Sequence, residues 1–217
     1  DAWKELRDWQ RELEAEKPAP STIRLDRLIR TRLTVHNSVK PEDWETRAAE
    51  LITTLKLLAL LTATPASNHW DRVRSHVRNT AANLKTPTDA ERFLTDALNA
   101  AREVKPKADT GNAGVLFDLH RLRGALYYEQ NRNMEALEDF AAAITVGKDI
   151  RSSELGLPIA VVVASLRLQA GHACLRLKKF AEAETMFTEG WEPYRAFMED
   201  RLRRNTRPDY TKMLLAI

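Results

Sequence analysis

The chain has 217 residues, of which 43% are hydrophobic and 30% are charged, and its net charge is +3. This balance is typical of a folded globular protein and excludes a disordered chain or a polycation. The basic residues are interleaved with acidic ones, as on a solvated surface. The longest apolar run, 51–61, is too short to cross a bilayer, so we expect a buried helix there and no membrane partner.

The first half of the chain is predicted to form five helices. Leu, Ala, Arg and Glu dominate the composition and favour helix, while glycine is scarce, with 7 residues. Prolines and capping residues separate the segments, which we place at 1–17, 21–37, 41–62, from 67 to about 84, and from Thr88 through Ala101. Thr88 and Glu91 have the spacing of a capping box. Arg32 falls within the apolar stripe of the second helix, and we expect its head group to reach water.

The second half is predicted to form four longer helices after a loop at 105–113. They cover about 114–130, 133–147, 155–177 and 180–204, and the short gaps between them favour antiparallel neighbours. The last residues, about 210–217, suggest a further partial helix. This apolar end and the first residue, Asp1, are consistent with a fragment of a larger protein.

Two segments of the second half repeat one another. One contains Gly124, Ala136 and Phe140, and the other contains Gly171, Ala183 and Phe187 at the same internal intervals. A weaker copy of the second-helix spacing lies upstream at Ala90, Leu94 and Ala97.

This pattern resembles the tetratricopeptide repeat, in which a small residue in one helix precedes Ala-x-x-x-Phe in the next. The two glycines are 47 residues apart, against about 34 in the standard repeat, so the helices are longer here. The resemblance implies an all-α fold of antiparallel helix hairpins stacked as a superhelix, an α-solenoid. It also implies that the two glycines lie where helices cross closely, opposite Ala136 and Ala183. We divide the chain into N-terminal helices at 1–66, a degenerate repeat or cap, and repeats at 67–217. HEAT-like pairs or a non-repetitive helical bundle are the alternatives.

No arrangement of residues points to catalysis. Cys174 and His172 are two residues apart on a helix and diverge, so we expect Cys174 to be a buried structural residue. A lone cysteine fits a reducing compartment, and we expect the cytoplasm. The scattered histidines and the absence of a glycine-rich loop lead us to expect no metal and no cofactor. We expect the five tryptophans to pack in the core.

The resemblance implies a non-catalytic scaffold whose inner wall binds a protein or peptide. The family's inner-wall positions, which flank the small residue, correspond here to Asp118, Arg121, Ala125, Tyr128, Glu129, Ser165, Leu168, His172, Leu175 and Arg176. A nucleic-acid partner is the alternative. It would bind Arg24, Arg27 and Arg30, or a basic patch of Arg201, Arg203, Arg204 and Arg207. A third interpretation is a sensor segment of a larger enzyme.

Overall fold

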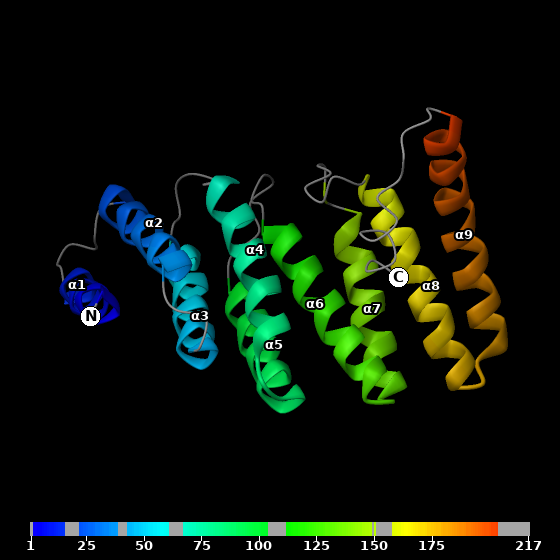
Figure 1. Ribbon diagram of the computed structural model, residues 1–217, viewed down its shortest axis with the longest axis horizontal. Coiled ribbons are helices and arrows are strands. Elements are labelled where there is room, and N and C mark those ends of the chain that lie inside the picture. Colours follow the sequence, from blue (N-terminus) through cyan, green and yellow to red (C-terminus); the bar gives the residue numbers. More distant parts are fainter. Residues whose placement is uncertain are drawn as a thin grey trace. The chain divides into compact units, whose positions relative to one another are not determined.

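The computed structural model describes residues 2–15, 22–38, 43–60, 67–103, 112–148, 150 and 158–203. Over these ranges the chain forms nine α-helices and no strand (Figure 1). The helices are α1 (Ala2–Ala15), α2 (Thr22–Ser38), α3 (Trp44–Leu60), α4 (Ser67–Asn83), α5 (Pro87–Arg102), α6 (Asn112–Glu129), α7 (Asn133–Gly147), α8 (Ile159–Arg176) and α9 (Phe180–Arg203). The predicted all-α class is confirmed for this part of the chain.

The start of α5 differs from the sequence-based prediction. Thr86, with φ −124° and ψ 149°, is the N-cap, and its hydroxyl accepts a hydrogen bond of 3.1 Å from the Asp89 amide. The prediction placed the cap at Thr88 with Glu91 as its partner. Pro87 explains the difference, because proline fits the first helical position, where its missing N–H is not needed.

The chain divides into two compact units, Asp1–Leu119 and His120–Ile217, and the division falls within α6. In the first unit, helices pack on both the next helix and the one after it: α2 contacts α3 and α4, and α3 contacts α4 and α5. In the second unit α7 packs on α8, and α8 packs on α9. Residues 61–66, where the predicted boundary between domains falls, lie outside the described residues.

The first unit buries charged groups among its apolar side chains. Leu28, Ile29 and Leu33 of α2 are 0–1% exposed, and so is Arg32 beside them. The Arg32 guanidinium donates to Glu50 of α3 and to Gln10 of α1. The expectation that its head group reaches water was therefore wrong, because a carboxylate and an amide replace the water.

The two hairpins of the second unit have the same turn. Asn131 after α6 and Lys178 after α8 both take a positive φ, 60° and 59°. Each turn closes with the same backbone bond, from Arg132 N to Tyr127 O and from Lys179 N to Cys174 O, both 2.9 Å. The turns are 47 residues apart, like the two glycines.

The glycines of the repeat lie at close helix approaches, as predicted, but each faces a phenylalanine ring and not the expected alanine. A Cβ on Gly124 would lie 2.8 Å from the Phe140 ring, and one on Gly171 would lie 2.8 Å from the Phe187 ring. The phenylalanine, and not the alanine, therefore covers each glycine. A side chain at either glycine would overlap the ring unless the ring moved.

A buried polar cluster joins α6 to α7 beside Gly124. Asp139 of α7 accepts hydrogen bonds from His120 Nδ1 (2.7 Å), Arg123 Nε (2.7 Å) and Arg123 Nη2 (2.9 Å) of α6. Burial acts to raise the pKa of the Asp139 carboxyl, but these bonds hold the pKa below its ordinary value. Asp139 is therefore ionised near neutral pH and fixes the register of the two helices.

Candidate functional site

Two of the expected partner-binding residues lie against each other at the ends of α6 and α8. The Arg176 guanidinium carbon lies 3.8 Å from the centroid of the Tyr128 ring. Arg176 Nη1 also donates to Tyr128 O at 3.0 Å and to Asn131 Oδ1 at 3.2 Å. The stacked pair is thus held in place before any partner arrives, and it presents a cation on an aromatic face.

The exposed face of α8 continues from this pair. Leu175 is 42% exposed, and His172 is exposed with its ring edge-on to Phe187 at 5.1 Å and 77°. Leu168 is half-buried beside Gly190 of α9, and Glu129 is exposed at the end of α6. We call Tyr128, Glu129, His172, Leu175 and Arg176 the α6–α8 platform. It combines aromatic, aliphatic and charged groups.

The other expected inner-wall residues lie elsewhere. Asp118 is fully buried in the first unit, where it accepts a bond from Arg74 Nε at 2.9 Å and lies 3.5 Å from Arg78 Nε. Ser165 is buried, and its hydroxyl donates to Val162 O at 2.8 Å. Arg121 and Ala125 are half-buried. Asp118 and Ser165 are therefore not accessible to a partner in this structure, contrary to expectation.

The structure describes the side chains of only one of the two arginine groups that the sequence suggested for nucleic-acid binding. On α2, Arg24 and Arg27 are exposed, and Arg30 Nε pairs with Asp26 Oδ2 at 2.8 Å. The side chains of Arg201, Arg203, Arg204 and Arg207 lie outside the described residues.

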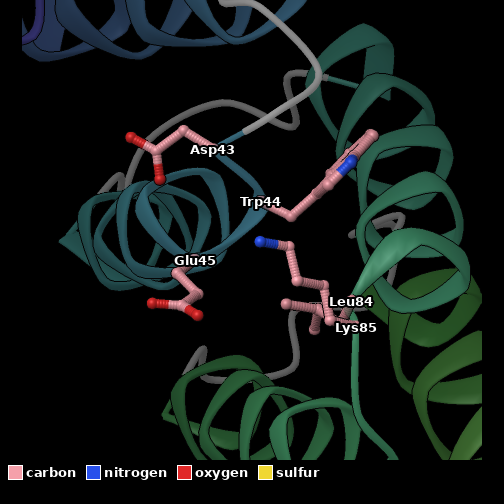
Figure 2. Close-up of a pocket in the computed structure, with 5 residues that line it drawn as sticks. All are labelled: Asp43, Trp44, Glu45, Leu84 and Lys85. Atoms are coloured by element: carbon pink, nitrogen blue, oxygen red, sulfur yellow. The ribbon is translucent and has the colours of Figure 1, made fainter.

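A shallow hollow of about 190 Å³ lies in the first unit between the start of α3 and the turn from α4 to α5. Figure 2 shows its lining residues, with the Lys85 side chain extending toward the start of α3 near Trp44. Asp43 caps α3 by accepting from the Thr46 amide at 3.0 Å. Hydrogen bonds from the Thr46 side chain and from this amide lower the pKa of the Asp43 carboxyl. The described lining residues offer opposite charges and an aromatic ring.

Trp44, which lines this hollow, contacts a cluster of Arg47 and two histidines that the sequence did not predict. Arg47 is 9% exposed, and its guanidinium carbon lies 4.6 Å from the centroid of the Trp44 ring. Its carbonyl oxygen lies 3.3 Å from His36 Nε2, and the His36 and His76 rings are 4.2 Å apart. These residues come from three different helices, so no local sequence pattern could have predicted that they lie together.

The tryptophans have several environments. Trp70 is 4% exposed, as expected for the core, but Trp191 of α9 is 52% exposed. The expectation of core packing was therefore wrong for Trp191. The signal available in the sequence was the high content of acidic residues in α9, which indicates a solvent-facing helix.

Cys174 is buried, as predicted, and burial raises the pKa of its thiol.

Among the described residues, no three His, Cys, Asp or Glu side chains are grouped so that they could hold a metal ion. Within the same part of the chain, none of the helices has the length and apolar character needed to cross a membrane.

No protein-family model matches the sequence, and no curated protein matches it. Among solved structures, the chain is similar to the crystal structure of BtubC (BKLC) from P. vanneervenii, with 14% identity and a TM-score of 0.49. The match covers 94% of this chain and 77% of that one.

Proposed function

We propose that this chain is a non-catalytic helical-repeat module of the tetratricopeptide-like type that binds a protein or peptide through the α6–α8 platform. The repeat arrangement is supported by the shared turns at Asn131 and Lys178 and by the shared glycine–phenylalanine contacts, 47 residues apart. Both are properties of tertiary geometry, so they add to the sequence pattern.

Bonds between a helix and its second neighbour further support the repeat. Arg7 of α1 bonds Glu50 of α3, and Asp26 of α2 bonds His69 of α4, each across 43 residues. Arg74 bonds Asp118 across 44 residues, and Arg176 bonds Tyr128 across 48 residues. In a stack of helix pairs, each helix meets its equivalent in the next pair at one repeat length.

The observation that carries the binding function is the Arg176–Tyr128 pair with Leu175 and His172 beside it. A tyrosine and an arginine that already touch lose little conformational entropy on binding, which favours their use as anchors. An exposed leucine beside them supplies the apolar contact, so the platform suits a short segment with an acidic and an apolar side chain.

Selection from a displayed peptide library, followed by calorimetry with the selected peptides, tests this proposal. Leu175→Ser and Arg176→Ala should each weaken binding by about tenfold, or about 1.4 kcal/mol. Circular dichroism should show unchanged helix content, because both side chains are exposed.

Met134→Ser is the matched control, since Met134 is 45% exposed on α7, close to the 42% of Leu175, and lies outside the platform. Equal loss with Met134→Ser, or peptides that bind all three variants like the wild type, would contradict the proposed site. Selection of an oligonucleotide with steep salt dependence in place of a peptide would move the function to nucleic-acid binding.

A further inference from the structure

The outer side of α2 carries a row of arginines. Arg24, Arg27 and Arg30 follow one another at steps of three residues, and all three are exposed. Residues at this spacing are neighbours on a helix surface, so their like charges repel. The sequence of α2 contains one carboxylate, Asp26, whose side chain is 29% exposed. Asp26 pairs with Arg30 Nε at 2.8 Å, and its other oxygen lies 2.7 Å from His69 Nε2, so one carboxylate serves two partners.

A fourth arginine joins this row from α4, which packs on α2. Arg72 Nη2 of α4 donates to Thr34 Oγ1 of α2 at 3.3 Å. Thr34 comes seven residues after Arg27, so the two lie on the same side of α2, about 10.5 Å apart along its axis. The sequence of α4 contains one acidic residue, Asp71. We call Arg24, Arg27, Arg30 and Arg72 the α2–α4 arginine face, and its cations outnumber the carboxylates beside it.

Two arginines of this face have no carboxylate partner among the described residues. Arg27 forms no hydrogen bond or ion pair there, and Arg72 bonds only a neutral threonine hydroxyl. On the other helices of this unit, exposed arginines are paired: Arg11 of α1 and Arg92 of α5 each pair with an aspartate of their own helix, at 3.1 Å and 3.5 Å. A guanidinium presents its donors as a fork that fits a carboxylate, so the unpaired cations select an acidic ligand.

We propose that the α2–α4 arginine face binds an acidic segment of a partner protein. Paired guanidinium and carboxylate groups form charge-assisted hydrogen bonds, which are stronger than those between neutral groups. The 17 residues of α2 extend about 26 Å, and an extended peptide of about eight residues has the same length. The face belongs to the first unit and the α6–α8 platform to the second, so the two sites are tested independently.

The side chains of this face favour an acidic protein segment over nucleic acid. Proteins that bind single strands stack bases on aromatic rings, which contributes about 1–3 kcal/mol per base. In α2 and α4 the described aromatic side chains are all buried, at 3–5% exposure: His36, His69, Trp70 and His76. The arginine face therefore offers charge without a stacking surface.

The test uses the full chain and a fluorescent peptide of about eight residues in which Glu and Ser alternate. Fluorescence anisotropy at low salt should show binding of this peptide, and a peptide with Gln in place of Glu should bind at least about tenfold more weakly. The double variant Arg27→Gln/Arg72→Gln should weaken binding of the Glu peptide by at least about tenfold. Circular dichroism should show unchanged helix content, because a glutamine amide can still donate to Thr34.

Arg11→Gln/Arg92→Gln is the matched control, because it removes the same charge from the same unit at side chains that are 76% and 70% exposed. This variant should bind the Glu peptide within about twofold of the wild type, since salt screens distant surface charges. Equal loss in the two double variants would reduce the attraction to net charge and overturn the proposal, as would equal binding of the Glu and Gln peptides. Tighter binding of an oligonucleotide of equal charge, abolished by Arg27→Gln/Arg72→Gln, would assign the face to nucleic acid instead.

Discussion

At the scale of single residues, the adjacent buried histidines of the first unit are sensitive to pH. His36 and His76 are 3% and 5% exposed, and their ring centroids are 4.2 Å apart. Burial lowers the pKa of His36 to about 3, with further lowering by His76 and Arg47. Burial and the Arg72 charge lower the pKa of His76 to about 4. Both rings are therefore neutral in the folded protein at neutral pH.

This pair predicts a loss of stability in mild acid. The unfolded chain takes up protons on both histidines near pH 6.5 while the folded chain does not, so the free energy of unfolding falls as the pH drops below about 6.5. The loss continues until the folded pKa values are reached. His76→Phe keeps a ring and removes one titrating group, so it should reduce the loss between pH 7 and pH 5 by about 1–2 kcal/mol.

Denaturant unfolding followed by circular dichroism at the two pH values measures this effect. His172→Phe, at an exposed position in the other unit, is the control and should leave the loss unchanged. An identical pH dependence in wild type and His76→Phe would show that the pair does not titrate on unfolding.

At the scale of the helices, most of the fold could be predicted from the sequence. Prolines and apolar periodicity located all the described helices to within a few residues, because both act locally along the chain. The errors also have local causes: Pro87 moved the cap of α5 to Thr86, and Pro158 starts α8 later than predicted. The repeat pattern identified Gly124 and Gly171 as close approaches, but the direction in which Phe140 points depends on tertiary packing.

The Gly124–Phe140 contact predicts an unusual response to a small substitution. Gly124→Ala would normally stabilise a helix by up to about 1 kcal/mol, but here the new Cβ would lie 2.8 Å from a ring that is itself 0% exposed. We expect a net destabilisation of about 1–3 kcal/mol. Thermal unfolding measures it, and Phe140→Leu in the same chain should relieve part of the cost through a favourable coupling energy.

Gly171→Ala is the matched comparison. Its Cβ would also lie 2.8 Å from a phenylalanine ring, but Phe187 is half-buried and has room to turn. A smaller loss than for Gly124→Ala is therefore expected. A gain in stability in both variants would mean that neither glycine is needed for the helix approach.

Across the whole molecule, the candidate site was predicted less well than the fold. Tyr128, His172 and Arg176 are accessible as expected, whereas Asp118 and Ser165 are buried. From the sequence we placed Asp118 on an accessible wall and the Arg32 head group in water, because the partners that bury them lie 44 and 18 residues away along the chain. Such pairs follow from the register of neighbouring helices, which a single sequence does not specify. They join α2 to α3 and α4 to α6.

The bonds between second-neighbour helices should contribute to stability in the order of their burial. Arg74 and Asp118 are 2% and 0% exposed, whereas Arg176 is exposed where it bonds Tyr128 O. Asp118→Asn leaves the Arg74 charge buried without its counter-charge, so it should lower the free energy of unfolding by about 3–5 kcal/mol. Arg176→Ala breaks an exposed bond and should cost under about 1 kcal/mol.

Asp8→Asn is the control for removing a carboxylate charge, because Asp8 pairs with Arg11 at 3.1 Å on the exposed side of α1. This substitution should lower the free energy of unfolding by less than about 0.5 kcal/mol. Replacing both buried partners, as Arg74→Met/Asp118→Leu, removes the charges together and should recover most of the stability lost in Asp118→Asn. Urea unfolding at constant pH gives all four values. If Asp118→Asn cost no more than Asp8→Asn, the bond between α4 and α6 would contribute nothing to stability. If the double variant were as unstable as Asp118→Asn, the loss would come from packing, because an unpaired charge could no longer account for it.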